Sequence, residues 1–185
     1  MKNTAVRFVC LGLVLLWGSA AGADRHRDPL TQPEVDQLRD TAQEPAMRLK
    51  LYIKFARARL EAIEQVRSDP KVTDRARETH DRLQDFLDVY DELNDNVDTF
   101  ADRRADLRKA LKNVIDADTE FQAKLQALKS SATAVPAETQ QYNFLLNNAV
   151  ETVEASAQDH RQLLAEQEEA AKHKKPTKAA PAEER

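Results

Sequence analysis

The sequence predicts an all-α protein, an elongated antiparallel helical bundle with coiled-coil-like hairpins around one long central helix. The glycines, Gly12, Gly18 and Gly22, all lie near the N-terminus. The rest of the chain therefore lacks the residue that adopts positive φ most readily, which disfavours tight β-hairpins. Prolines separate segments with apolar residues at helical spacing. The longest of these segments keeps alternating steps of three and four residues from Leu83 to Leu128.

Residues 1–23 have the pattern of a secretory signal peptide. Lys2 and Arg7 precede an apolar run at 8–17, and small residues at 18–23 end in an Ala-x-Ala cleavage site. The apolar run is short for a membrane-spanning helix, although an uncleaved anchor is the alternative. We therefore expect an exported protein, periplasmic or secreted, without a transmembrane segment in the mature chain.

The composition of the expected mature chain excludes two classes of protein. The only cysteine of the sequence, Cys10, would be removed with the signal peptide, so we expect no disulfide in the mature chain. Removing Lys2 and Arg7 from the 28 basic residues leaves 26 against 32 acidic residues, a formal charge of −6. This balance argues against a general nucleic-acid binder, which needs clustered basic residues to neutralise phosphates.

The helical bundle domain is expected at 31–171, after a flexible N-terminus at 24–30. Thr31 has the position of an N-cap, Pro33 falls in the first turn, and Glu34 completes a capping box. A short helix to about Thr41 follows.

A second helix is expected from Pro45 to about Arg67. It is apolar on more than one side, which predicts two packing partners. Folding back through Pro70 would place its basic residues opposite acidic residues of the next helix. The expected pairs are Lys50 with Glu92, Lys54 with Asp88, and Arg57 with Asp85.

The third helix is expected to begin with the cap Thr73 and to run to Lys129. It would be about 85 Å long, continuous or gently bent, with a break near Asn94 to Arg104 as the alternative. Its apolar heptad seam, broken only by Arg104 and Asp118, is the predicted interaction surface. The seam consists of Leu83, Phe86, Tyr90, Leu93, Val97, Phe100, Leu107, Leu111, Val114, Phe121, Leu125 and Leu128.

A last helix, after a joint at 133–136, carries a matching seam and is expected to pack antiparallel on the second half of the long helix. In that register Arg104 faces Glu166 or Gln167, and Asp118 faces Thr152 or Val153. We interpret Arg104, Asp118 and His160 as polar residues that set the register of the helices. For His160, a role in metal binding or pH sensing is the alternative. Residues 172–185 are expected to form a disordered Lys/Ala/Pro tail.

The sequence offers no predicted catalytic, cofactor-binding or metal-binding residue. It contains no glycine-rich phosphate loop, no G-x-S-x-G motif and no cysteine nucleophile in the mature chain. We therefore expect a non-enzymatic helical interaction or scaffold protein of the cell envelope, binding a protein partner or a second copy through its seams. A small-molecule ligand is left open. A metal-binding bundle, based on scattered histidines, is a third possibility.

The segment Leu30-Thr31-Gln32-Pro33-Glu34 resembles the L-T-x-x-Q element of the small helical periplasmic chaperones related to Spy and CpxP, with Glu34 in place of Gln. The resemblance implies an exported, all-helical, disulfide-free protein that holds unfolded clients on a cradle-shaped surface. A capping box accounts for the same residues. A chaperone-like holder of unfolded proteins is therefore the alternative to the scaffold.

Overall fold

The computed structural model describes residues 28–132 and 136–173, and every regular element within them is a helix. This confirms the predicted all-α class. The expected signal peptide and residues 174–185 of the expected tail lie outside the described residues. The last helix continues through His173, two residues further than predicted. The helices are α1 Gln32–Asp40, α2 Pro45–Ser68, α3 Arg75–Asp102, α4 Arg108–Ala132, α5 Pro136–Thr139 and α6 Asn143–His173.

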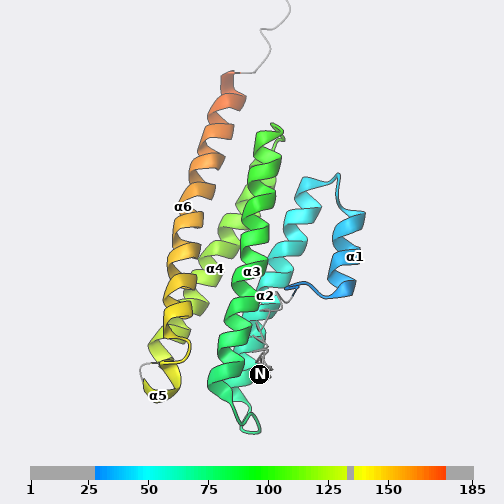
Figure 1. The fold of residues 1–185 in the computed structure, drawn as a ribbon. Coiled ribbons are helices and arrows are strands. Elements are labelled where there is room, and N and C mark those ends of the chain that lie inside the picture. The colour runs from blue at the N-terminus through cyan, green and yellow to red at the C-terminus, as the bar shows by residue number, and fades with distance from the viewer. Residues whose placement is uncertain (1–27, 133–135, 174–185) are drawn as a thin grey trace, which may run out of the picture.

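Four long helices form the bundle, and the short helix α1 lies on the outer side of α2 (Figure 1). The most extensive packing is within two antiparallel hairpins: α2 with α3, here called the first hairpin, and α4 with α6, the second hairpin. The hairpins meet along α2–α4 and α3–α6, whose helices run parallel. The helices α3 and α4 are consecutive in the chain but lie diagonally across the bundle.

The first described residues, 28–30, lie beside α2 and are bonded to it through Pro29. Glu34 accepts a hydrogen bond from the backbone N–H of Thr31 at 2.8 Å, so the predicted capping box is confirmed. Arg59 of α2 donates to the same Glu34 carboxylate at 2.7 and 2.9 Å and to the carbonyl of Pro29 at 2.7 Å. Together these bonds attach the start of α1 to the bundle.

The favoured prediction of one continuous central helix is wrong, and the alternative of a break near Asn94 to Arg104 is confirmed. The helix α3 ends at Asp102, and the chain reverses through residues 103–107, here called the corner, before α4 begins. Arg104 has φ 57°, and the N–H of Ala105 donates to the carbonyl of Phe100 at 3.0 Å. Reversal lets both halves of the seam pack into one core. Residues 94–99, expected to be a weak point, stay helical.

The start of α3 differs from the prediction by one residue. Asp74, not Thr73, is the N-cap, and its carboxylate accepts a hydrogen bond from the N–H of Arg77 at 3.2 Å. An aspartate both caps the free N–H groups and complements the helix dipole, so it is the stronger cap.

The predicted antiparallel pairing of α2 with α3 is present, but the predicted charge pairs are not the contacts that form. Tyr52 lies opposite Glu92, and Arg48 donates to Asn96 at 2.6 Å. Arg57 turns to the other neighbour of α2 and makes a bidentate ion pair with Glu120 of α4, with distances of 2.7 to 3.0 Å. Arg57 therefore joins α2 to its second packing partner, α4.

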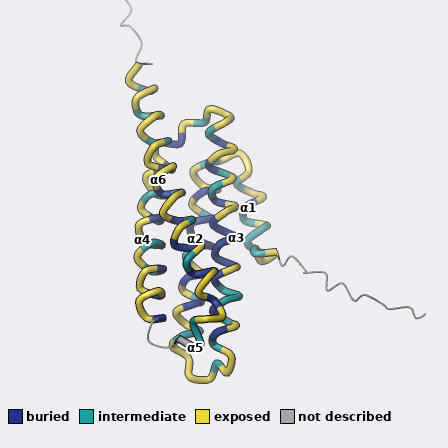
Figure 2. Tube along the Cα trace, turned by 60° about the vertical axis from the view of Figure 1, so that its left-hand side comes forward, coloured by how far each residue is buried: buried dark blue, intermediate teal, exposed yellow. Residues whose placement is uncertain are grey.

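The core runs along the axis of the bundle, and the exposed residues lie on the outer faces of the helices (Figure 2). Phe86, Tyr90 and Phe121 pack ring against ring at its centre, with centroids 5.6 to 6.1 Å apart. None of the helices in the described part of the chain combines the length and apolar character that a membrane span requires.

Candidate functional site

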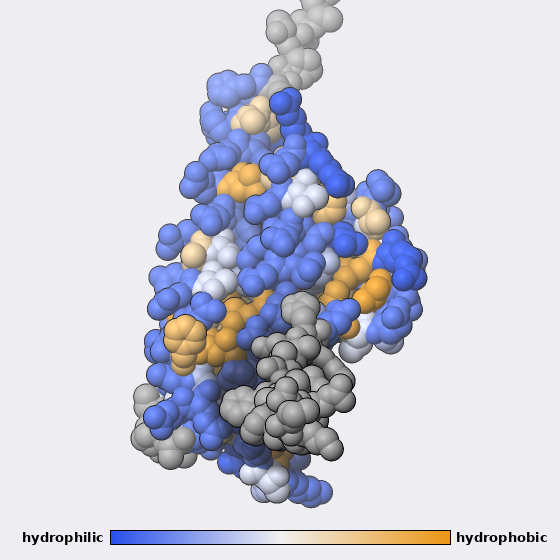
Figure 3. All heavy atoms as spheres, in the orientation of Figure 1, coloured by the Kyte–Doolittle hydropathy of each residue, from blue (hydrophilic) through white to orange (hydrophobic). Residues whose placement is uncertain are grey.

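All twelve seam residues lie in the core of the single chain. None is more than 8% exposed, and most are fully buried. On the face shown in Figure 3, the surface is mainly hydrophilic, with hydrophobic residues gathered in short stretches. In the closed bundle the seam is therefore covered by the rest of the chain and is not an open surface. The cause is the corner, because it folds the seam of α4 back beside the helices that cover α3.

Arg104 does not occupy a seam position between packed helices. It lies in the corner and is exposed. The residues expected to face it, Glu166 and Gln167, do lie in the same region. Gln167 contacts the backbone of the corner: its Oε1 accepts from the N–H of Leu107 at 2.8 Å, and its Nε2 donates to the carbonyl of Ala105 at 3.2 Å. Gln167 thus fastens the corner to α6.

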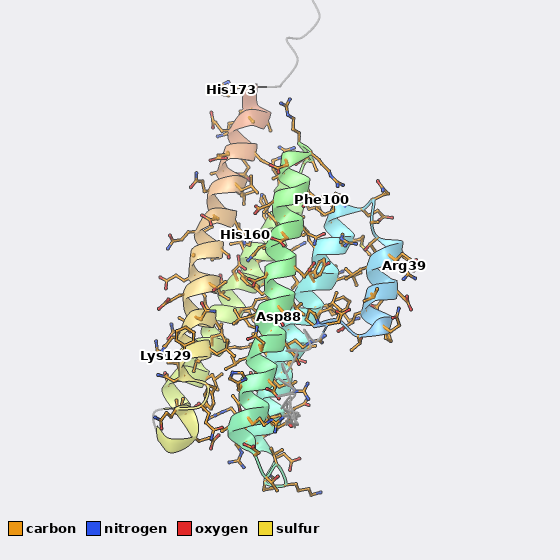
Figure 4. The ribbon with its side chains drawn as sticks, in the orientation of Figure 1. Arg39, Asp88, Phe100, Lys129, His160 and His173 are labelled. Atoms are coloured by element: carbon orange, nitrogen blue, oxygen red, sulfur yellow. The ribbon has the colours of Figure 1, made fainter. Side chains whose placement is uncertain are left out.

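The structure brings the other two register residues together with a tyrosine. Tyr90 of α3, Asp118 of α4 and His160 of α6 form what we call the polar cluster. The Tyr90 hydroxyl donates to Asp118 Oδ1 at 2.8 Å, and His160 Nδ1 lies 2.9 Å from Asp118 Oδ2. Since a carboxylate accepts hydrogen bonds, Nδ1 is the donor. Figure 4 shows His160 on α6 where this helix faces the rest of the bundle.

The polar cluster is deeply buried: Tyr90 and Asp118 are 0% exposed and His160 is 4% exposed. Burial raises the pKa of the Tyr90 hydroxyl far above its usual range, and the neighbouring Asp118 carboxylate raises it further. The tyrosine therefore keeps its proton and remains a donor. A buried carboxylate requires such partners, because an unpaired polar group in the core is costly.

The register of α4 against α6 differs from the prediction. Asp118 was expected opposite Thr152 or Val153 but faces His160, two helical turns further along α6. The short helix α5 and the turn that follows it delay the start of the last helix to Asn143. The longer connection therefore shifts the pairing of the two helices.

Beside the polar cluster, a groove of about 340 Å³ runs between α3 and α6. Asn94 Nδ2 donates to Ser156 Oγ at 3.0 Å on its floor, and the Asn94 Oδ1 atom is buried without a hydrogen-bond partner. The lining residues are Asn94, Val97, Asp98, Ala101, Asp102, Ser156, Asp159, His160 and Leu163.

This arrangement resembles the base and orienting acid of a hydrolytic site, because Asp118 orients His160 as an acid orients a catalytic base. A nucleophile is the third requirement. The groove holds one hydroxyl, Ser156, whose oxygen is bonded to Asn94.

Within the described residues, no group of three or more histidine, cysteine, aspartate or glutamate side chains is placed to hold a metal ion.

Sequence reasoning missed Tyr90 as a polar partner, and it expected Gln167 to face the Arg104 side chain instead of the backbone of the corner. Tyr90 was assigned to the apolar seam, but its hydroxyl is the hydrogen-bond donor to Asp118. The available signal was the presence of Asp118, a charged residue on a seam, which calls for a donor on a facing helix. Gln167 left no such signal, because its partners are backbone groups of the corner.

Comparison with protein-family models, with curated proteins and with solved structures finds no match to this chain. The resemblance of residues 30–34 to the chaperone element stays a prediction. In the structure Thr31 and Glu34 form a helix cap that also binds Arg59.

Proposed function

We propose that the chain is an exported, non-enzymatic helical interaction protein that binds another protein through its seam when its two hairpins part. One observation carries this proposal. The bundle consists of two separately paired hairpins whose only covalent link is the corner, where Arg104 holds a left-handed conformation. A non-glycine residue pays about 1–2 kcal/mol for that conformation.

The composition of the seam supports a protein partner. The seam consists of large aliphatic and aromatic side chains on helices, and an amphipathic helix of a partner offers the matching surface. In the closed state each hairpin covers the part of the seam that lies on the other. Binding therefore requires the two hairpins to separate, which lowers the apparent affinity by the fraction of molecules that are open.

The polar cluster supports a structural role for Asp118 and His160. It joins α3 of the first hairpin to α4 and α6 of the second, and it satisfies the buried carboxylate from both sides. Such a network favours one alignment of the hairpins over shifted ones. This is the expected behaviour of register-setting residues and requires no substrate.

A covalent lock between the hairpins tests the proposal. Asn94 of α3 and Ser156 of α6 lie on different hairpins with side-chain atoms 3.0 Å apart. Replacing both residues by cysteine, in a chain with Cys10→Ala, places two thiols across the hairpins, and their oxidation to a disulfide would keep the bundle closed. The reduced form of the same variant is the matched control.

The readout is affinity capture of proteins from the envelope of the organism that encodes the chain, followed by mass spectrometry. We expect one or a few proteins to bind the reduced variant and to be lost with the oxidised one. Capture of the same proteins by both forms would contradict binding through the seam. Broad suppression of aggregation of several unfolded proteins by the reduced form alone would favour the chaperone-like holder over the scaffold.

A further inference from the structure

We infer that the chain forms a domain-swapped dimer, in which the corner straightens, α3 and α4 become one helix, and each second hairpin packs on the first hairpin of the other copy. The inference rests on the proposed parting of the hairpins and names its partner, a second copy of this chain.

The amino-acid sequence of the corner suits a continuous helix. Residues 103–107 read Arg-Arg-Ala-Asp-Leu, without glycine or proline, and arginine, alanine and leucine are among the strongest helix formers. The seam also keeps its phase across the corner, since Phe100, Arg104, Leu107 and Leu111 are four, three and four residues apart. Two helices joined by a reversal have no need of a common phase. A single straight helix does need it.

The closed corner replaces helical hydrogen bonds with bonds to side chains. The N–H of Leu107 is bonded to the side chain of Gln167, and the N–H of Arg108 to the carboxylate of Asp106. In a straight helix both groups would donate to carbonyls four residues earlier. Straightening would also move Arg104 from φ 57° to the ordinary helical region, which removes the clash of its Cβ with the backbone.

The contacts between the hairpins can be reproduced between two copies. The pairs Arg57–Glu120, Lys124–Glu64, Asn94–Ser156 and Tyr90–Asp118 each join the first hairpin to the second. The ring contacts of Phe121 on α4 with Phe86 and Tyr90 on α3 also join the two hairpins. A second copy supplies identical hairpins, so it restores every one of these pairs, which is the thermodynamic basis of domain swapping.

The cysteine pair introduced above reports the swap directly. In the closed monomer, residues 94 and 156 of one chain form the disulfide, and denaturing non-reducing electrophoresis gives a monomer. In the swapped dimer the disulfides join different chains and give a covalent dimer. We expect the covalent dimer after refolding from urea at high protein concentration, with an elongated particle of twice the monomer mass by light and X-ray scattering.

Two corner variants of the cysteine-free chain (Cys10→Ala) should shift the equilibrium in opposite directions. Arg104→Gly relieves the left-handed residue and weakens the continuous helix at both corners of the dimer, and should raise the dimer dissociation constant by roughly a thousandfold. Gln167→Ala removes bonds that only the closed corner needs, and should lower the dissociation constant. If the two substitutions only destabilised the fold, they would not change the dissociation constant in opposite directions.

The inference is overturned if no dimer forms, if dimers carry only intrachain disulfides, or if both corner variants move the dissociation constant in the same direction. Light scattering on the cysteine-free chain covers the case in which the double-cysteine variant does not fold. Absence of a swapped dimer together with lock-sensitive capture of other proteins would refute this inference and leave the proposed function standing. A swapped dimer, together with capture of the same proteins by the oxidised and reduced variants, would support this inference and refute the proposed function.

Discussion

Removing the hydroxyl of Tyr90 is the most direct test of the polar cluster. The Tyr90→Phe substitution keeps the ring, which packs against Phe86 and Phe121, and removes the hydroxyl that donates the 2.8 Å hydrogen bond to Asp118. Because the lost bond is to a fully buried carboxylate, which is left with one donor fewer, we expect a loss of about 1.5–3 kcal/mol in the free energy of unfolding.

The size of this effect is large for a bundle of this length. Domains are typically stable by about 5–15 kcal/mol, so one hydroxyl would account for a sizeable share. For a domain of about 150 residues the loss corresponds to a fall of about 3–12 °C in the melting temperature. The Asp118→Ala substitution should cost about 3–5 kcal/mol, because it leaves the Tyr90 hydroxyl and His160 Nδ1 without their acceptor.

The assay is urea unfolding followed by circular dichroism at helical wavelengths, and Tyr52→Phe is the matched control. Tyr52 has an equally buried ring, 2% exposed, but the contacts of its hydroxyl with Glu92 and Arg48 are each 3.4 Å long and therefore weak. We expect Tyr52→Phe to cost less than Tyr90→Phe, about 0.5–1 kcal/mol, because the contacts of its hydroxyl are long. Equal stability of the two phenylalanine variants would refute the view that the polar cluster holds the hairpins together.

Three further predictions follow from the described contacts. Stability should fall as pH rises above about 10. Burial raises the pKa of the Tyr90 and Tyr52 hydroxyls in the folded chain, so the unfolded chain loses these protons at lower pH than the folded chain does. Urea midpoints measured from about pH 7 to 11 should therefore decline less steeply for Tyr90→Phe. Arg59→Ala should cost about 1–3 kcal/mol and speed amide hydrogen exchange in 32–40, since it removes the guanidinium bonded to Glu34; unchanged exchange there would contradict the attachment of α1. Phe121→Ala should cost about 3–5 kcal/mol by opening a cavity in the aromatic centre, measured by the same urea assay; a loss below about 1 kcal/mol would mean that the rings repack freely.

The helices and most of their ends follow from local rules, which is why sequence reasoning found them. Pro45 starts α2, Thr31 and Glu34 cap α1, and the spacing of the seam identifies its members as one buried face. Each of these signals depends on residues within a few positions of one another. The antiparallel pairing of α2 with α3 was also predictable, because a short connection joins them.

Residues distant in the sequence determined the rest. Nothing local distinguishes a bent helix from a reversal at Arg104, because the corner residues other than Asp106 are good helix formers. The reversal is favoured by packing both halves of the seam on α2 and α6, an energy visible only when four helices are placed together.

The amino-acid sequence by itself determined that this chain is helical, where most helices begin and which side chains they bury. The tertiary structure alone decided that the seam closes on itself, and that Tyr90, Asp118 and His160 meet. The physical reason is one of range. Helix propensity and capping depend on residues within a turn or two. The partner of an apolar face or of a buried carboxylate lies on another helix, far away in the sequence, and is fixed only when the helices pack together.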